Sequence, residues 1–216
     1  MARPGQLANA IAEVFDQDVA TVRHMARILR DAGHMNMEKA GRGGGTMTPR
    51  DATNLLIAAA GASRVKYACR PVEQDGACRS MEGSWVLPFE GLPELAVLGS
   101  DHTFADAIEA LLHAAIHGSV DPETGIVTIP GNQDLARLRV EIVMEEPYAR
   151  STIRVGLQGR DEDDAPHMIN PVSRNYQMGY SDGVFDPPFQ FAVPTDLTHT
   201  HSFSEKAIYR VAQEFR

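Results

Sequence analysis

The first periodic pattern of apolar positions lies close to the N-terminus. Leu7, Ile11 and Val14 recur three or four positions apart, a spacing that places them on one face of a helix. The pattern predicts a helix over residues 6–15. The polar tripeptide Asp16-Gln17-Asp18 interrupts it and predicts a short turn.

A second amphipathic helix follows this turn. Asp18 is a residue type that favours the N-cap, and the pattern continues to about Asp31, before Gly33, which suits a left-handed helix end. The apolar stripe of this helix consists of Val22, Met25, Ala26 and Leu29. The polar side consists of Thr21, Arg23, His24, Arg27 and Arg30. One side is therefore suited to a core, and the other is basic.

A glycine-rich segment follows the second helix. EKAGRGGG carries Lys39 and Arg42 between the short strand-like pieces HMNM and TMT. This arrangement predicts a β-hairpin, or wing, with a basic tip. Met35, Met37 and Met47 are expected to fill gaps in the core beneath it.

Cap residues predict two further helices. Thr48 and Pro49 favour the start of a helix that continues to Gly61. Thr103 is placed to cap a helix over residues 104–117, whose apolar positions recur at helical spacing. Residues between these two helices are irregular in pattern, and their first part is interpreted as a connector.

Alternating apolar residues in the C-terminal half predict an antiparallel pair of strands around a turn near Glu146-Pro147. The positions expected on the buried face are Leu138, Val140, Ile142, Ile153, Val155 and Leu157. Residues 125–129 and 85–87 are further candidate strands. A last helix is expected after Ser204.

The N-terminal segments resemble a known DNA-binding motif. Ile11-Ala12-Glu13, Ala20-Thr21-Val22 and the RxLRxAG pattern from Arg27 to Gly33 resemble the helix-turn-helix of bacterial and phage regulators. The glycine-rich segment resembles the wing of a winged helix. Asp16 and Gln17 stand where this family typically has a glycine and an apolar residue. The resemblance covers about residues 5–60.

The resemblance and the patterns together predict an α+β protein in two parts. Residues 1–62 are expected to form a winged helix-turn-helix DNA-binding domain. Residues 63–216 are expected to form an α+β body with a small antiparallel sheet, and this body is expected to dimerise or to sense a signal. The DNA-binding residues that the resemblance implies are Thr21, Arg23, His24, Arg27, Arg30, Lys39, Arg42 and Arg50. Arginine donates paired hydrogen bonds to guanine, while other cations hold phosphates.

The distribution of charge is compatible with this division. The 216 residues carry a formal net charge of −9. Residues 1–50 hold seven Arg or Lys and five Asp or Glu, a net charge of +2, and the remainder holds 13 and 24, a net charge of −11. A mildly basic head on an acidic body follows from these numbers.

Other chemistry lacks a complete motif. His113 and His117 are one helical turn apart, but HAAIH lacks the glutamate of HExxH and has no third ligand nearby in sequence. GRGGG lacks the Gly-Lys-Ser/Thr of a phosphate loop. Neither cysteine belongs to a nucleophile motif. We therefore expect no enzyme activity, no cofactor and no metal site.

The sequence thus predicts a cytoplasmic homodimer that binds double-stranded DNA sequence-specifically, as a transcriptional regulator of phage or mobile-element type. The longest apolar run, LLIAAAGA, is too short to span a membrane. Two alternatives stay open. One is a DNA-packaging or replication protein that uses the same head, and the other is a protein-interaction module or inhibitor with an acidic body.

Overall fold

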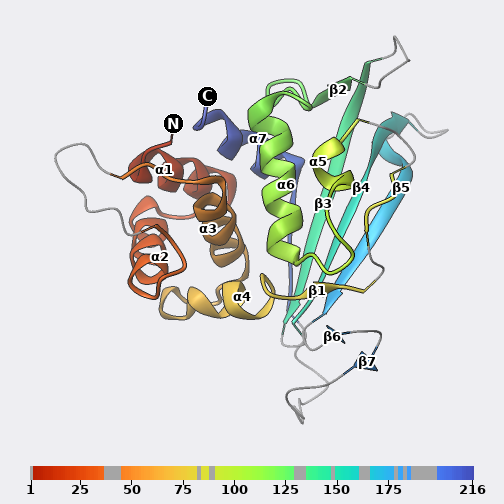
Figure 1. Cartoon of the computed structure of the whole chain (residues 1–216). Helices are drawn as coiled ribbons and strands as arrows, with labels where there is room; N and C mark the ends of the chain where they lie inside the picture. Colours follow the sequence, from red (N-terminus) through yellow and green to blue (C-terminus); the bar gives the residue numbers. More distant parts are fainter. Residues whose placement is uncertain are drawn as a thin grey trace.

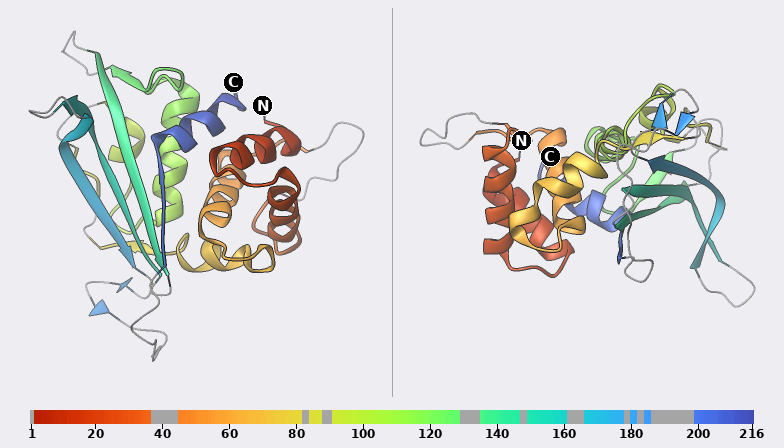
Figure 2. Two further views of the ribbon diagram at one scale, coloured as in Figure 1. Left: turned by 180° about the vertical axis from the view of Figure 1, so that it is seen from behind. Right: turned by 90° about the horizontal axis from the view of Figure 1, so that it is seen from below.

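Helices cover one face of a curved antiparallel sheet in this chain (Figure 1). The computed structural model describes residues 2–36, 45–81, 84–87, 91–128, 135–146, 149–160, 166–177, 180–181, 184–185 and 199–216. Views from behind and from below agree that the helices lie on the same side of the sheet (Figure 2). The chain is therefore of mixed α and β structure, as the sequence predicts.

Helices and strands alternate only partly along the chain, because most helices precede the long strands. The helices are α1 (Pro4–Val14), α2 (Val19–Asp31), α3 (Pro49–Gly61), η1 (Val65–Tyr67), α4 (Cys69–Gln74), α5 (Pro93–Ala96), α6 (Phe104–His117) and α7 (Glu205–Gln213). The strands are β1 (Arg79–Ser80), β2 (Ile126–Thr128), β3 (Leu135–Glu146), β4 (Arg150–Arg160), β5 (Pro166–Gln177), β6 (Tyr180–Ser181), β7 (Val184–Phe185) and β8 (His199–Ser204). Within these described segments, no helix combines the length and apolarity needed to cross a membrane.

Helices α1, α2 and α3 form where the apolar periodicity predicts them. Val22, Met25 and Leu29 of α2 are buried, while Ala26 is half-buried at the side of the stripe. Helix α3 packs against both α1 and α2. It begins with a capping box in which Thr48 Oγ1 accepts a hydrogen bond from the Asp51 backbone N–H at 3.1 Å. The predicted cap residue therefore starts this helix.

Helix α6 also has the predicted ends. Thr103 caps it by accepting a hydrogen bond from the Asp106 N–H at 3.2 Å. Gly118 ends it with a φ of 104°, in the left-handed region that glycine adopts without steric cost. Its apolar side faces the sheet, where the Phe104 and Tyr176 rings meet edge to face at 5.4 Å.

The main sheet has the order β1-β5-β4-β3-β2, and β8 also pairs with β3. Strands β3 and β4 are antiparallel, with Leu138 opposite Leu157, Val140 opposite Val155 and Ile142 opposite Ile153. All of these side chains are buried except Leu157, which is half-buried. The predicted pair and its buried face are confirmed.

The register of β4 against β5 shifts at Gly156. A Cβ atom at this position would lie 2.5 Å from Met168 Cγ and 2.8 Å from the Ile169 carbonyl oxygen. These distances are too short for any side chain, so the close approach of β5 requires glycine here. Strand β5 was not predicted, because its sequence PHMINPVSRNYQ is largely polar and contains two prolines.

One apolar core joins the segments predicted to be separate domains. Helix α3 packs on α6, and α1 packs on α7. Arg210 of α7 donates a hydrogen bond from Nε to Glu13 Oε2 of α1 at 2.8 Å. The buried residues on both sides of residue 62 form one contiguous cluster. The three N-terminal helices therefore share their core with the sheet.

Two predicted strand regions are wrong for the residues that the structure describes. Residues 85–87 form no strand; instead Trp85 is buried, with the Arg174 guanidinium 5.2 Å from its ring centroid. Residues 34–36 and 46–48, expected as parts of the wing strands, also form none. Met35 and Met47 are buried there as expected, whereas Met37 lies outside the described residues.

A buried histidine makes folding sensitive to pH. His102 Nδ1 lies 2.7 Å from the Gly99 carbonyl oxygen and Nε2 lies 3.0 Å from the Tyr176 hydroxyl, an arrangement that suits a neutral ring. Burial is the largest influence on His102 and lowers its pKa. The unfolded chain therefore takes up a proton at a higher pH, about 6.5, than the folded chain does.

We expect the free energy of unfolding to decrease as pH falls through about 6.5, because the contribution of neutral His102 is present above the unfolded pKa and is lost progressively below it. Urea denaturation at several pH values measures the effect. His102→Gln should be less stable, but its free energy of unfolding should lack the pH dependence that His102 contributes. His113→Asn, at a partly exposed helix position, should keep it. An unchanged pH dependence in His102→Gln contradicts the prediction.

Candidate nucleic-acid interface

A tightly held turn connects α1 to α2. Asp16 has a φ of 49°, in the left-handed region that aspartate tolerates better than most residues. The backbone N–H of Gln17 donates to the Ala12 carbonyl at 2.9 Å, and its side-chain Nε2 donates to the Ala59 carbonyl of α3 at 2.8 Å. Asp16 thus adopts a conformation that glycine usually supplies, and Gln17 fixes the turn to α3.

The outward side of α2 carries cationic and polar groups. The side chains of Arg23, His24, Arg27 and Arg30 are exposed, and that of Thr21 is half-buried. The structure therefore brings Arg23, His24, Arg27 and Arg30 together on the exposed side of α2, whereas Thr21 lies at the edge of the buried stripe.

Weak local contacts hold two of these arginines. Arg23 Nη2 donates to Asn9 Oδ1 at 3.2 Å. Arg27 Nε lies 3.7 Å from Asp31 Oδ2, and 72% of the Arg27 side chain is exposed. An exposed i,i+4 ion pair such as Arg27–Asp31 contributes about 0.3–0.5 kcal/mol. Both guanidinium groups can therefore exchange these partners for a ligand at little cost.

A second basic segment lies next to α2. Arg64, Lys66 and Arg70 are exposed, and η1, which contains Lys66, contacts α2. Tyr67 is 44% exposed, with Lys66 Nζ 4.7 Å from its ring centroid. This segment was not predicted as part of the interface, because its irregular pattern indicated a connector. The signal was present in RVKYACR, where basic residues recur beside an aromatic one.

One buried carboxylate holds Asn36 and Thr48 close to the start of α3. Asp51 is 3% exposed, and its Oδ1 accepts a hydrogen bond from the Asn36 N–H at 2.7 Å. Its Oδ2 accepts hydrogen bonds from the Thr48 N–H at 2.7 Å and the Thr48 hydroxyl at 2.8 Å. Lys39 and Arg42 lie outside the described residues.

Arg50 does not join the basic face of α2. Its Nη2 lies 2.5 Å from Asp106 Oδ1 and 2.6 Å from Glu109 Oε2, both on α6. Burial raises the pKa of Asp106, but hydrogen bonds from Arg50 and Thr103 outweigh that effect and lower it overall. The charge of Arg50 is paired at the contact between α3 and α6, apart from the basic side of α2.

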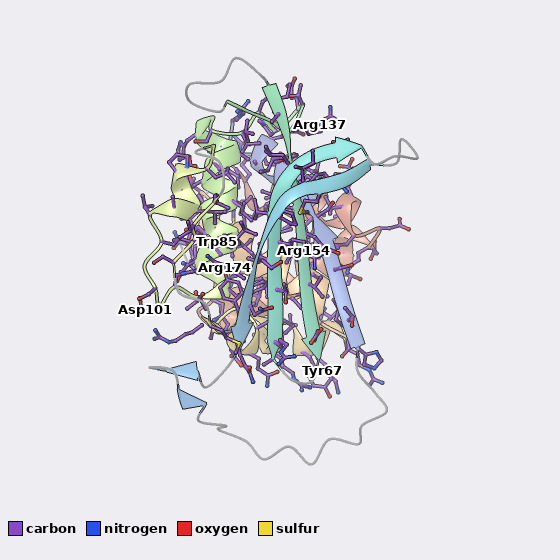
Figure 3. All side chains as sticks on the ribbon, turned by 90° about the vertical axis from the view of Figure 1, so that its right-hand side faces the viewer. Tyr67, Trp85, Asp101, Arg137, Arg154 and Arg174 are labelled. Atoms are coloured by element: carbon purple, nitrogen blue, oxygen red, sulfur yellow. The ribbon has the colours of Figure 1, made fainter. Side chains whose placement is uncertain are left out.

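The outer face of the sheet offers a different kind of surface. Figure 3 shows Arg154 on this face, which helices leave uncovered. A hollow of about 510 Å³ is lined by Arg139, Val140, Glu141, Arg154, Met168, Ser202, Phe203 and Ser204. Arg139 pairs with Glu205 at 2.7 Å, and Arg154 with Glu141 at 2.9 Å. These charges are balanced locally, so α2 is the stronger candidate for binding a polyanion.

Comparisons of this chain with protein-family models, with curated proteins and with solved structures found no match. The candidate interface is therefore identified by its own geometry and charge. Its described part consists of the exposed side of α2 and the adjoining residues 64–70.

Proposed function

We propose that this chain binds double-stranded DNA sequence-specifically through the exposed side of α2 and acts as a transcriptional regulator. The observation that carries the proposal is the basic, exposed side of α2. This helix follows a turn that Gln17 fixes to α3. An α-helix fits the major groove, where outward side chains reach base edges. Arg27 and His24 occupy central positions on that side.

Neighbouring cations support the proposal by supplying phosphate contacts. Arg64, Lys66 and Arg70 lie on the segment that follows α3, and this segment contacts α2 through η1. Such contacts set the register of a recognition helix without reading sequence. Residues 71–216 hold 10 basic and 23 acidic residues, a net charge of −13, which favours an orientation that turns them away from DNA.

We further propose a homodimer whose twofold contact lies in residues 63–216. Helix-turn-helix readers typically bind two half-sites about one helical turn apart. Helices α1 to α3 bury their apolar sides within the shared core, so this contact is assigned to the rest of the chain.

Selection of bound fragments from random duplex DNA tests the proposed function. The expected result is one enriched motif with two half-sites about 10 base pairs apart, bound by a dimer in sedimentation. Retention of duplexes without an enriched motif, in larger oligomers, favours the packaging or replication alternative. No retention of duplex DNA at low salt contradicts DNA binding and favours a protein-interaction module.

Two single substitutions should separate base reading from phosphate binding. Arg27→Ala is expected to cost about 1–3 kcal/mol on the selected site and to relax its sequence preference. Lys66→Ala should weaken binding to all duplexes alike and reduce the dependence on salt by about one counterion. Fluorescence anisotropy at several salt concentrations measures both effects. If both variants lose the same affinity for every duplex, whatever its sequence, base reading by Arg27 is contradicted.

A further inference from the structure

Three side chains with metal-binding atoms meet beside the end of α2. His34 follows α2, whereas Cys69 and Glu73 lie one helical turn apart on α4. One ligand atom from each lies within 4.8 Å of the other two. His34 Nε2 and Glu73 Oε1 are 3.0 Å apart. His34 is distant in sequence from the other two residues, which is why the sequence pattern indicated no metal site.

The backbone beneath this cluster is well fixed. The His34 carbonyl accepts a hydrogen bond from Asn54 Nδ2 at 2.6 Å, and the His34 N–H donates to the Leu29 carbonyl at 2.8 Å. Helix α4 is anchored by the buried residues Pro71 and Val72 and packs against α3. The convergence of the three side chains therefore follows from the packing of the helices.

The donor set and its spacing suit zinc. Zinc accepts imidazole nitrogen, thiolate sulfur and carboxylate oxygen, at roughly 2.0 to 2.3 Å each. Donors around one tetrahedral ion are then roughly 3.3–3.7 Å apart, so rotations that move atoms by about 1 Å complete the geometry. A thiolate and a carboxylate balance the two charges of the ion. Magnesium and calcium require oxygen ligands and fit this set poorly.

We propose that His34, Cys69 and Glu73 bind one zinc ion, with water as the fourth ligand. His34 and Cys69 are half-buried and Glu73 is exposed, so the fourth position is open to solvent. The ion links the residues that follow α2 to α4. Zinc binding does not require DNA, so its test is independent of the proposed regulatory function.

The test is a zinc titration of the full chain in competition with a chromophoric chelator. The wild type should bind one equivalent, and Cys69→Ser and Glu73→Gln should each weaken binding by at least about tenfold. His113→Asn is the matched control, because His113 also lies beside a glutamate, with Nε2 3.9 Å from Glu109 Oε1, and stacks on His117. This control should bind zinc like the wild type.

Cobalt provides a second measurement that identifies the ligands. The wild-type cobalt complex should show a thiolate-to-metal charge-transfer band, and Cys69→Ser should lose it although Cys78 is retained. Circular dichroism verifies that each variant is folded. Zinc binding that is equally tight in wild type and Cys69→Ser overturns the proposal, as does a cobalt complex without the thiolate band. An equal loss in His113→Asn also overturns it.

Discussion

Replacing Val140 by Asp should prevent stable folding of the chain. Val140 is 3% exposed on β3, and its partner Val155 on β4 is fully buried. An unpaired carboxylate at this position costs several kcal/mol. That cost is comparable with the total stability of a typical domain, about 5–15 kcal/mol. The expected result is loss of the cooperative unfolding transition.

Val143→Asp is the matched control, because Val143 lies on the same strand but on the outer face and is only half-buried. It should remain folded. Trp85, the single tryptophan in the sequence, is buried and reports on packing near the sheet, while circular dichroism reports on all helices. A Val140→Asp variant that melts like the wild type contradicts the assignment of the buried face.

Local sequence signals were sufficient to predict where helices start and which face of a strand pair is buried. The capping residues Thr48 and Thr103 start helices as predicted, because a hydroxyl at that position satisfies an otherwise unpaired N–H. The buried face of β3 and β4 was predictable because one-sided burial forces alternation. Strand β5 was not predicted, because pairing with β4, rather than an apolar pattern of its own, places it in the sheet.

The candidate sites were predictable only where one helix holds the residues. Arg23, His24, Arg27 and Arg30 share a helix, so spacing alone places them on one side. The pairing of Arg50 with α6 and the meeting of His34 with Cys69 depend on contacts between helices far apart in sequence. No local pattern encodes such contacts, and the hydrogen bonds of buried Asp51 to Asn36 and Thr48 were missed for the same reason.

Simultaneous replacement of Arg23, Arg27 and Arg30 by alanine should remove specific duplex binding. If each guanidinium contributes at least about 1 kcal/mol in the complex, affinity falls by about 100-fold or more. The variant should remain folded, because all three side chains are exposed and none belongs to the buried stripe of α2. Anisotropy on the selected duplex measures the affinity, and urea denaturation verifies the fold.

A control with the same change in charge separates position from net charge. Arg79, Arg150 and Arg154 are exposed on the strands, and Arg79 and Arg154 pair with surface carboxylates, as Arg27 does. Replacing these three by alanine also removes three positive charges, so long-range repulsion from DNA increases similarly. The control should keep most of the wild-type affinity, because these residues lie away from α2. Equal losses in the two triple variants point to nonspecific electrostatics, and unchanged binding in the α2 variant contradicts the proposed interface.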